Sequence, residues 1–185
     1  MPVRYTLDAR QSRFTVQAFA GGLLSGFAHN PTITIRDFTG EVQLTPDAPE
    51  DAALQMTIRD DALEVTGNVN QRDVPEIEKT MRTEVLETAA YPEIRFRGTA
   101  IGATKIADNW YRIQLRGELS LHGVKKVQEV DTQLRLVENE IRLSGEFTLL
   151  LSAYRMKRVS AVGGMVTLKD EIKFAFDVVG RNVPA

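Results

Sequence analysis

The dominant feature of the sequence is a two-residue alternation of apolar and polar side chains. In WYRIQLRGELSL (residues 110–121), apolar residues stand at Ile113, Leu115 and Leu119, and polar residues such as Arg112 stand between them. In a β-strand, successive side chains point to opposite faces of the sheet. The alternation therefore predicts a strand with one dry face and one wet face.

The same alternation recurs along most of the chain, with turn-forming residues between the segments. These segments are residues 12–18, 32–37, 40–44, 53–59, 93–100, 130–137, 140–151 and 172–178. Many strands joined by tight turns are typical of an antiparallel sandwich or barrel. Several segments are long, on the order of ten residues, which favours a closed barrel of about eight strands. We predict an all-β fold, an eight-stranded antiparallel barrel.

One segment, residues 73–88, has a different period. Its apolar residues Val74, Ile77, Met81 and Val85 are three or four positions apart, as in an amphipathic helix. We predict one helical insertion here, either outside the barrel or across one of its ends.

Composition excludes several classes of function. The chain has 185 residues, no Cys and a formal net charge of -2 with scattered Lys and Arg. These values predict a single domain, residues 1–185, no thiol chemistry and no nucleic-acid partner. The polar N-terminus lacks the pattern of a secretory signal, and the longest apolar run, residues 18–28, is too short to span a bilayer. We expect a cytoplasmic protein without stable membrane insertion.

The chain has only two histidines, His29 and His122. A zinc site needs about three protein ligands, and no Cys is present to complete one, so we predict no metal site. His122 precedes Gly123 at the end of a strand, on the extrapolated wet face with Ser120, and we predict a hairpin corner whose imidazole bonds the turn backbone. His29, just before Pro31, is expected in a turn or loop. A joint site formed by both histidines remains an alternative.

The segment Ser152–Glu171 is expected to be a loop. It carries Arg155, Lys157 and Arg158. Three cations at irregular spacing are typical of a solvated loop. Contact of this loop, at a barrel mouth, with a lipid headgroup or a membrane surface is the alternative.

Five motifs, in order, resemble the YceI-like family of lipocalin-like proteins that bind polyisoprenoids. They are YTLDARQSRF (5–14), DFTGEVQL (37–44), NQRDVPEIEKTMRTEVLETAAYPEIRFRGT (70–99), GELSLHGVKK (117–126) and VTLKDEIKFAFDV (166–178). The resemblance implies an eight-stranded lipocalin-like barrel with a helical insertion after the third strand. It also implies an elongated apolar cavity for an isoprenoid chain such as a quinone tail, and often a homodimer. Many relatives carry a secretory signal and work in the periplasm.

Two segments depart from the common pattern of the family. They are AFAGGLLSGFAHNPTI (18–33) and SAVGGMVTLKDE (160–171). These departures indicate a distinct branch, so the resemblance does not specify the ligand.

Together these observations favour a non-enzymatic protein that binds a polyprenol or quinone tail inside the barrel, as a carrier or by sequestration. We expect no cofactor and no catalytic residue. The expected lining is Phe14, Val16, Ile33, Met56, Phe96, Leu119, Phe147, Phe174 and Phe176. Two alternatives remain at the level of sequence: a structural or interaction barrel with a filled core, and a small-molecule enzyme that uses His29 or His122.

Overall fold

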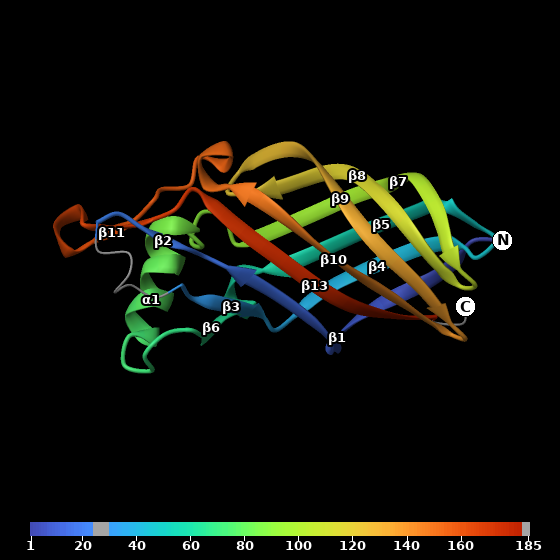
Figure 1. Ribbon diagram of the computed structural model, residues 1–185, viewed down its shortest axis with the longest axis horizontal. Helices are drawn as coiled ribbons and strands as arrows, with labels where there is room; N and C mark the ends of the chain where they lie inside the picture. The colour runs from blue at the N-terminus through green and yellow to red at the C-terminus, as the bar shows by residue number, and fades with distance from the viewer. Residues whose placement is uncertain (24–29, 183–185) are drawn as a thin grey trace.

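The chain forms a closed, eight-stranded antiparallel barrel, as predicted, in a computed structural model that describes residues 1–23 and 30–182 (Figure 1). The strands follow the order β1-β4-β5-β7-β8-β9-β10-β13, and pairing of β13 with β1 closes the circle. The barrel strands are β1 (Val3–Gln17), β4 (Phe38–Thr45), β5 (Ala48–Arg59), β7 (Glu93–Ala107), β8 (Trp110–Leu121), β9 (Val124–Val137), β10 (Glu140–Leu150) and β13 (Glu171–Asn182).

Additional short strands lie beyond the barrel wall. They are β2 (Ala20–Gly21), β3 (Thr32–Ile35), β6 (Leu63–Gly67), β11 (Ser160–Ala161) and β12 (Val166–Leu168). The strand β3 pairs with β1 and with β6, whereas β2, β12 and β11 form a separate three-stranded sheet.

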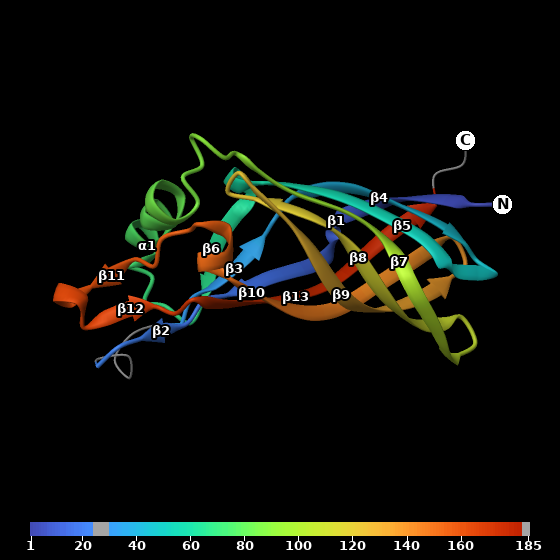
Figure 2. The same cartoon turned by 90° about the horizontal axis from the view of Figure 1, so that it is seen from above.

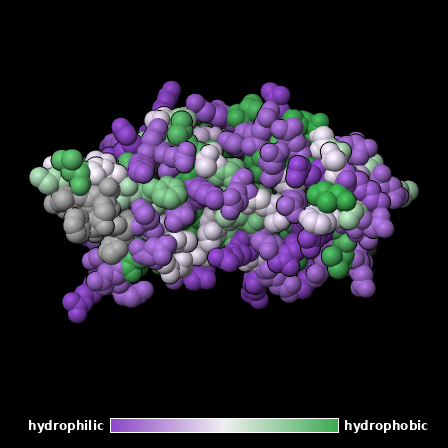
Figure 3. All heavy atoms as spheres, in the orientation of Figure 1, coloured by the Kyte–Doolittle hydropathy of each residue, from purple (hydrophilic) through white to green (hydrophobic). Residues whose placement is uncertain are grey.

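The two-residue alternation of the sequence corresponds to the inside and outside of the barrel. Ile113, Leu134 and Ile141 are at most 1 % exposed, whereas their polar neighbours along each strand face solvent. Polar side chains accordingly cover much of the visible surface (Figure 3). Burial of one apolar face per strand is the driving force that holds the wall together.

Two glycines allow close approach of β7 and β8. Gly98 lies opposite Gly117, and a Cβ atom on Gly117 would stand 2.4 Å from the Cα atom of Gly98. A Cβ atom on Gly98 would stand 2.8 Å from the ring of Phe96. The missing side chains thus leave room for an inward-facing aromatic ring.

The predicted helical insertion is confirmed, although it is shorter than residues 73–88. The helix α1 (Val74–Thr80) continues as a π-helical turn, η3 (Met81–Val85). Helical geometry does not extend to residue 88 because Glu87 has a positive φ of 49°. The helix lies at one end of the barrel (Figures 1 and 2).

Side chains of this helical segment bind the backbone of β6. The backbone N–H of Val65 donates to Glu78 Oε1 over 2.9 Å, and Arg82 Nη2 donates to the carbonyl of Leu63 over 3.1 Å. Because β6 is the last strand on its side of the sheet, these contacts satisfy polar groups that an edge strand would leave open.

The prediction of a loop over Ser152–Glu171 is wrong in part. The 3₁₀ turns η4 (Leu151–Tyr154) and η5 (Val162–Gly164) and the strands β11 and β12 lie in or overlap this segment. Strands of two or three residues are too short to show a period, so the sequence gives no signal for them. No helix in residues 1–23 and 30–182 has the length and apolar character needed to cross a membrane.

We expect Gly117→Ala to destabilise the barrel by about 1–3 kcal/mol, since its Cβ atom would overlap the backbone of β7. Gly102→Ala on β7 is the matched control, because no heavy atom lies within 4 Å of the place that its Cβ atom would take. Urea unfolding of both variants measures the difference. Equal free energies of unfolding for the two variants would contradict the close approach.

Candidate functional site

The barrel encloses an apolar cavity of about 80 Å³. Seven of the nine residues expected to line the interior do line it. They are Phe14, Met56, Phe96, Leu119, Phe147, Phe174 and Phe176. The strands place these side chains inward because each is on the buried face of its two-residue alternation.

The other two expected residues, Val16 and Ile33, lie outside the cavity lining. They are buried and face each other across the β1–β3 ladder. The sequence does not show that the last residues of β1 pair with β3, on the edge that β4 occupies near the start of the strand.

Further lining residues are not among those expected. They are Leu54, Ile58, Ile94, Leu115, Leu121, Gln128, Val130, Thr132, Leu143, Leu149 and Val178. The aliphatic ones share the inward face of strands already recognised, so the alternation itself signals them. The sequence does not predict that Gln128 faces inward, because the regular alternation on its strand begins only at Val130.

Aromatic rings from three strands form one side of the cavity. The rings of Phe147 on β10 and Phe174 on β13 stack with centroids 4.7 Å apart and an angle of 3°. Phe14 on β1 meets Phe174 and Phe176 edge to face, at 6.2 and 5.9 Å. Such pairs add to the stability that burial gives, and they also fill space that a ligand chain would need.

Among the lining residues that the structure describes, two have polar side chains, and both come from β9. Thr132 is 1 % exposed, and its hydroxyl lies 3.5 Å from the carbonyl of Val130. Gln128 is half-buried, and its Nε2 donates to the carbonyl of Glu129 over 2.8 Å. The described lining is therefore apolar on every strand except β9, which supplies both polar side chains.

The second small space in the barrel, about 10 Å³, lies toward the other half and is lined by residues such as Leu44, Ala52 and Ile113. It is too small to hold a ligand, since one water molecule alone needs roughly 10–15 Å³. The larger cavity is thus the candidate site.

His122 forms the corner of the β8–β9 hairpin, as predicted. Its φ is 50° and that of Gly123 is 70°, the combination that a type I′ turn requires. The prediction that His122 lies on the wet face is wrong, since His122 is only 8 % exposed. The strand ends at Leu121, so the alternation does not extend to the turn.

The imidazole of His122 joins segments distant in sequence. Its Nδ1 lies 3.1 Å from the carbonyl oxygen of Tyr154, its Nε2 lies 2.8 Å from Glu87 Oε2, and its ring centroid lies 4.4 Å from that of Tyr91. The prediction of a backbone partner in the turn itself is therefore wrong. Both ring nitrogens are engaged, which identifies His122 as a structural link between the hairpin, η4 and the chain that follows the helix.

His29 lies outside the described residues. Within the residues that the structure describes, no three His, Asp or Glu side chains are grouped so that they could hold a metal ion.

Comparison with known proteins agrees with this geometry. The family model for the YceI-like domain matches residues 5–180. The chain belongs to the YceI-like family. No curated protein sequence matches it.

Solved structures share the fold of this YceI-like chain at low sequence identity. Burkholderia cenocepacia BcnA has a TM-score of 0.70 and 15 % identity, over 94 % of this chain and 98 % of that one. A polyisoprenoid binding domain from Saccharophagus degradans has a TM-score of 0.67 and 14 % identity, over 98 % and 99 %. The Campylobacter jejuni YCEI protein has a TM-score of 0.59 and 18 % identity, over 83 % and 85 %.

A buried carboxylic acid, Asp60, lies where β5 ends. Asp60 is 2 % exposed, and its Oδ1 has no hydrogen-bond partner among the described residues. Burial raises the pKa of Asp60 from 3.8 to about 6, and the negative charges of Asp61 and Glu93 contribute to this rise, while His122 opposes it. Ionisation of Asp60 is thus less favourable in the folded YceI-like barrel than in the unfolded chain.

We expect this group to make stability fall as pH rises. Below pH 3.8 the acid is protonated in both states, and as pH rises to about 6 the unfolded chain ionises first, which favours unfolding. The rise of the Asp60 pKa from 3.8 to about 6 corresponds to a loss of about 3 kcal/mol in the free energy of unfolding. This loss persists at pH values above the pKa of the folded state.

Asp60→Asn removes this ionisation. The free energy of unfolding of the variant, relative to that of the parent protein, should therefore increase as pH rises from about 4 to about 7. Urea unfolding across this range measures the gain, with Asp51→Asn on the exposed face of β5 as the control. A difference between Asp60→Asn and the parent that does not vary with pH would contradict the raised pKa.

Proposed function

We propose that this YceI-like protein binds the hydrocarbon chain of an isoprenoid-type lipid, a polyprenol or a quinone tail, inside its barrel. It would act as a carrier or by sequestering the lipid. The observation that carries the proposal is the apolar cavity, whose lining has only two polar side chains among the described residues. The likeness to a polyisoprenoid binding domain from Saccharophagus degradans supports the same ligand class.

Apolar burial would supply the affinity. Each CH₂ group transferred from water into such a cavity contributes roughly 0.8 kcal/mol. Binding of this kind needs no catalytic group and no cofactor, and we assign none. The enzyme alternative has little support at His122, because Glu87 and Tyr154 already occupy both of its ring nitrogens.

The cavity must expand to admit a long chain. An engineered cavity of about 150 Å³ binds a molecule of benzene, and the cavity here is smaller, about 80 Å³. Phe147 and Phe176 are half-buried, and rotation of their rings would open the space that the aromatic cluster fills. The small volume is also the observation that favours the second candidate, an interaction barrel with a filled core.

Native mass spectrometry after incubation with geranylgeraniol tests the two candidates. We expect about one lipid per chain in the parent protein, and strongly reduced loading in Met56→Trp, because the larger indole would occupy the cavity. Gln55→Trp is the matched control, since Gln55 is the preceding residue on β5 and points outward. Absence of bound lipid in the parent protein would favour the filled core.

A further inference from the structure

The barrel wall is incomplete between β9 and β10. These strands form a ladder only where Thr132–Val137 pairs with Glu140–Gly145. The last close approach is at Gly145, where a Cβ atom would stand 2.5 Å from the carbonyl oxygen of Asp131. Toward the helix-bearing end, the two strands diverge (Figure 2).

Beyond this point each strand keeps only one partner among the described strands. Val124–Asp131 of β9 pairs with β8 alone, and Glu146–Leu150 of β10 pairs with β13 alone. We call the gap between these two stretches the side opening. Residues of both stretches line the cavity: Gln128 from β9, and Phe147 from β10. The cavity therefore extends to the side opening.

The side opening has an unusual pattern of side chains. By alternation, Lys126 and Gln128 belong to the same face of β9 as Val130 and Thr132. Val130 and Thr132 are buried, whereas Gln128 is half-buried and Lys126 is exposed. Val127, on the outward-facing side, is 64 % exposed. This stretch therefore has polar residues on the face that is buried farther along β9 and an exposed apolar residue on the other face, the reverse of the usual pattern of a barrel strand. Core packing does not account for these side chains.

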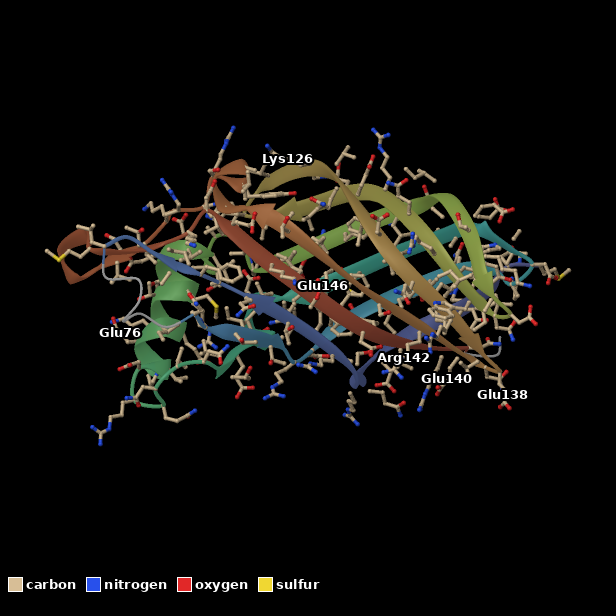
Figure 4. The ribbon with its side chains drawn as sticks, in the orientation of Figure 1. Glu76, Lys126, Glu138, Glu140, Arg142 and Glu146 are labelled. Atoms are coloured by element: carbon tan, nitrogen blue, oxygen red, sulfur yellow. The ribbon has the colours of Figure 1, made fainter. Side chains whose placement is uncertain are left out.

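Three lysines lie on or next to the strands that border the opening, Lys125 and Lys126 on β9 and Lys173 on β13, which pairs with β10. Lys125 pairs with Glu118 over 3.0 Å, and Lys173 pairs with Glu146 over 2.8 Å. Lys126 makes no ion pair within the described part of the chain. Figure 4 labels Lys126 on β9 and Glu146 on β10, which belong to the two stretches that border the opening.

We propose that a lipid enters through the side opening and that its polar head rests there, against Gln128 and Lys126. The head would present acceptor oxygens, as a phosphate ester or a quinone does, because both side chains offer N–H donors. Its hydrocarbon tail extends along the cavity. This inference rests on the proposed function and adds to it the route of entry and the place of the head.

Entry is tested with a thiol at the opening. The chain has no Cys, so the thiol of Gln128→Cys is unique, and Val127→Cys provides the control on the opposite face of the same strand. Each folded variant is labelled with fluorescein maleimide and then incubated with geranylgeraniol. We expect the label at position 128 to reduce loading in native mass spectra by about tenfold or more, which corresponds to roughly 1.4 kcal/mol. The label at position 127 should leave loading unchanged.

The reverse order gives a second measurement. Lipid bound beforehand should slow labelling of Gln128→Cys and leave labelling of Val127→Cys unaffected. Full loading of labelled Gln128→Cys would overturn entry through the side opening and leave the proposed function intact. An unlabelled parent protein that takes up no lipid would overturn both.

The head is tested by comparing ligands. We expect Lys126→Gln to weaken binding of geranylgeranyl phosphate by about tenfold or more, as for loss of a hydrogen bond to a charged group, and to leave geranylgeraniol unaffected. Lys125→Gln is the matched control, since its side chain is paired on the outside. An equal loss with decylubiquinone would place a carbonyl head at the same residues. If Lys126→Gln leaves the affinity for both the phosphate and the quinone unchanged, the polar head does not bind at the side opening.

Discussion

The ladder between β1 and β13 is the interaction on which the rest of the structure depends. It joins the first strand of the chain to the last and so turns an open sheet into a barrel. Without it, both strands would present open edges, and the apolar face of the sheet would have no enclosed interior to fill. The cavity exists only because this pairing closes.

The β1–β13 ladder contains an irregularity that the side chain of Ser12 bridges with hydrogen bonds. The register shifts between Asp8 and Arg13, and the hydroxyl of Ser12 lies within this shift. Ser12 Oγ donates to the carbonyl of Asp8 over 2.6 Å and accepts from the backbone N–H of Val179 over 2.9 Å. Bulges of this kind bend a strand and increase its twist, which helps long strands to coil around a barrel.

The two ends of the barrel interior differ in what they bury. Toward the helix, the cavity lies beside the stacked rings of Phe147 and Phe174. The polar residues His122 and Asp60 are buried in turns at the ends of β8 and β5. Toward the other end, residues such as Leu44 and Leu134 pack almost without space. Close packing stabilises a fold, whereas empty apolar space forfeits dispersion contacts. The packed half thus contributes more to stability than the half that contains the cavity.

The sequence by itself determined the strands, the helix and the hairpin corner, because these depend on local side-chain periods and on residues such as Gly123 that permit a positive φ. It also identified most of the cavity lining, since the inward face of a strand follows from a period of two. Only the tertiary structure decided which inward residues enclose empty space, since Val16 and Phe14 share a face of β1 but only Phe14 reaches the cavity. The partners of His122 and the divergence of β9 from β10 likewise depend on contacts between segments far apart in the chain, for which a local pattern carries no signal.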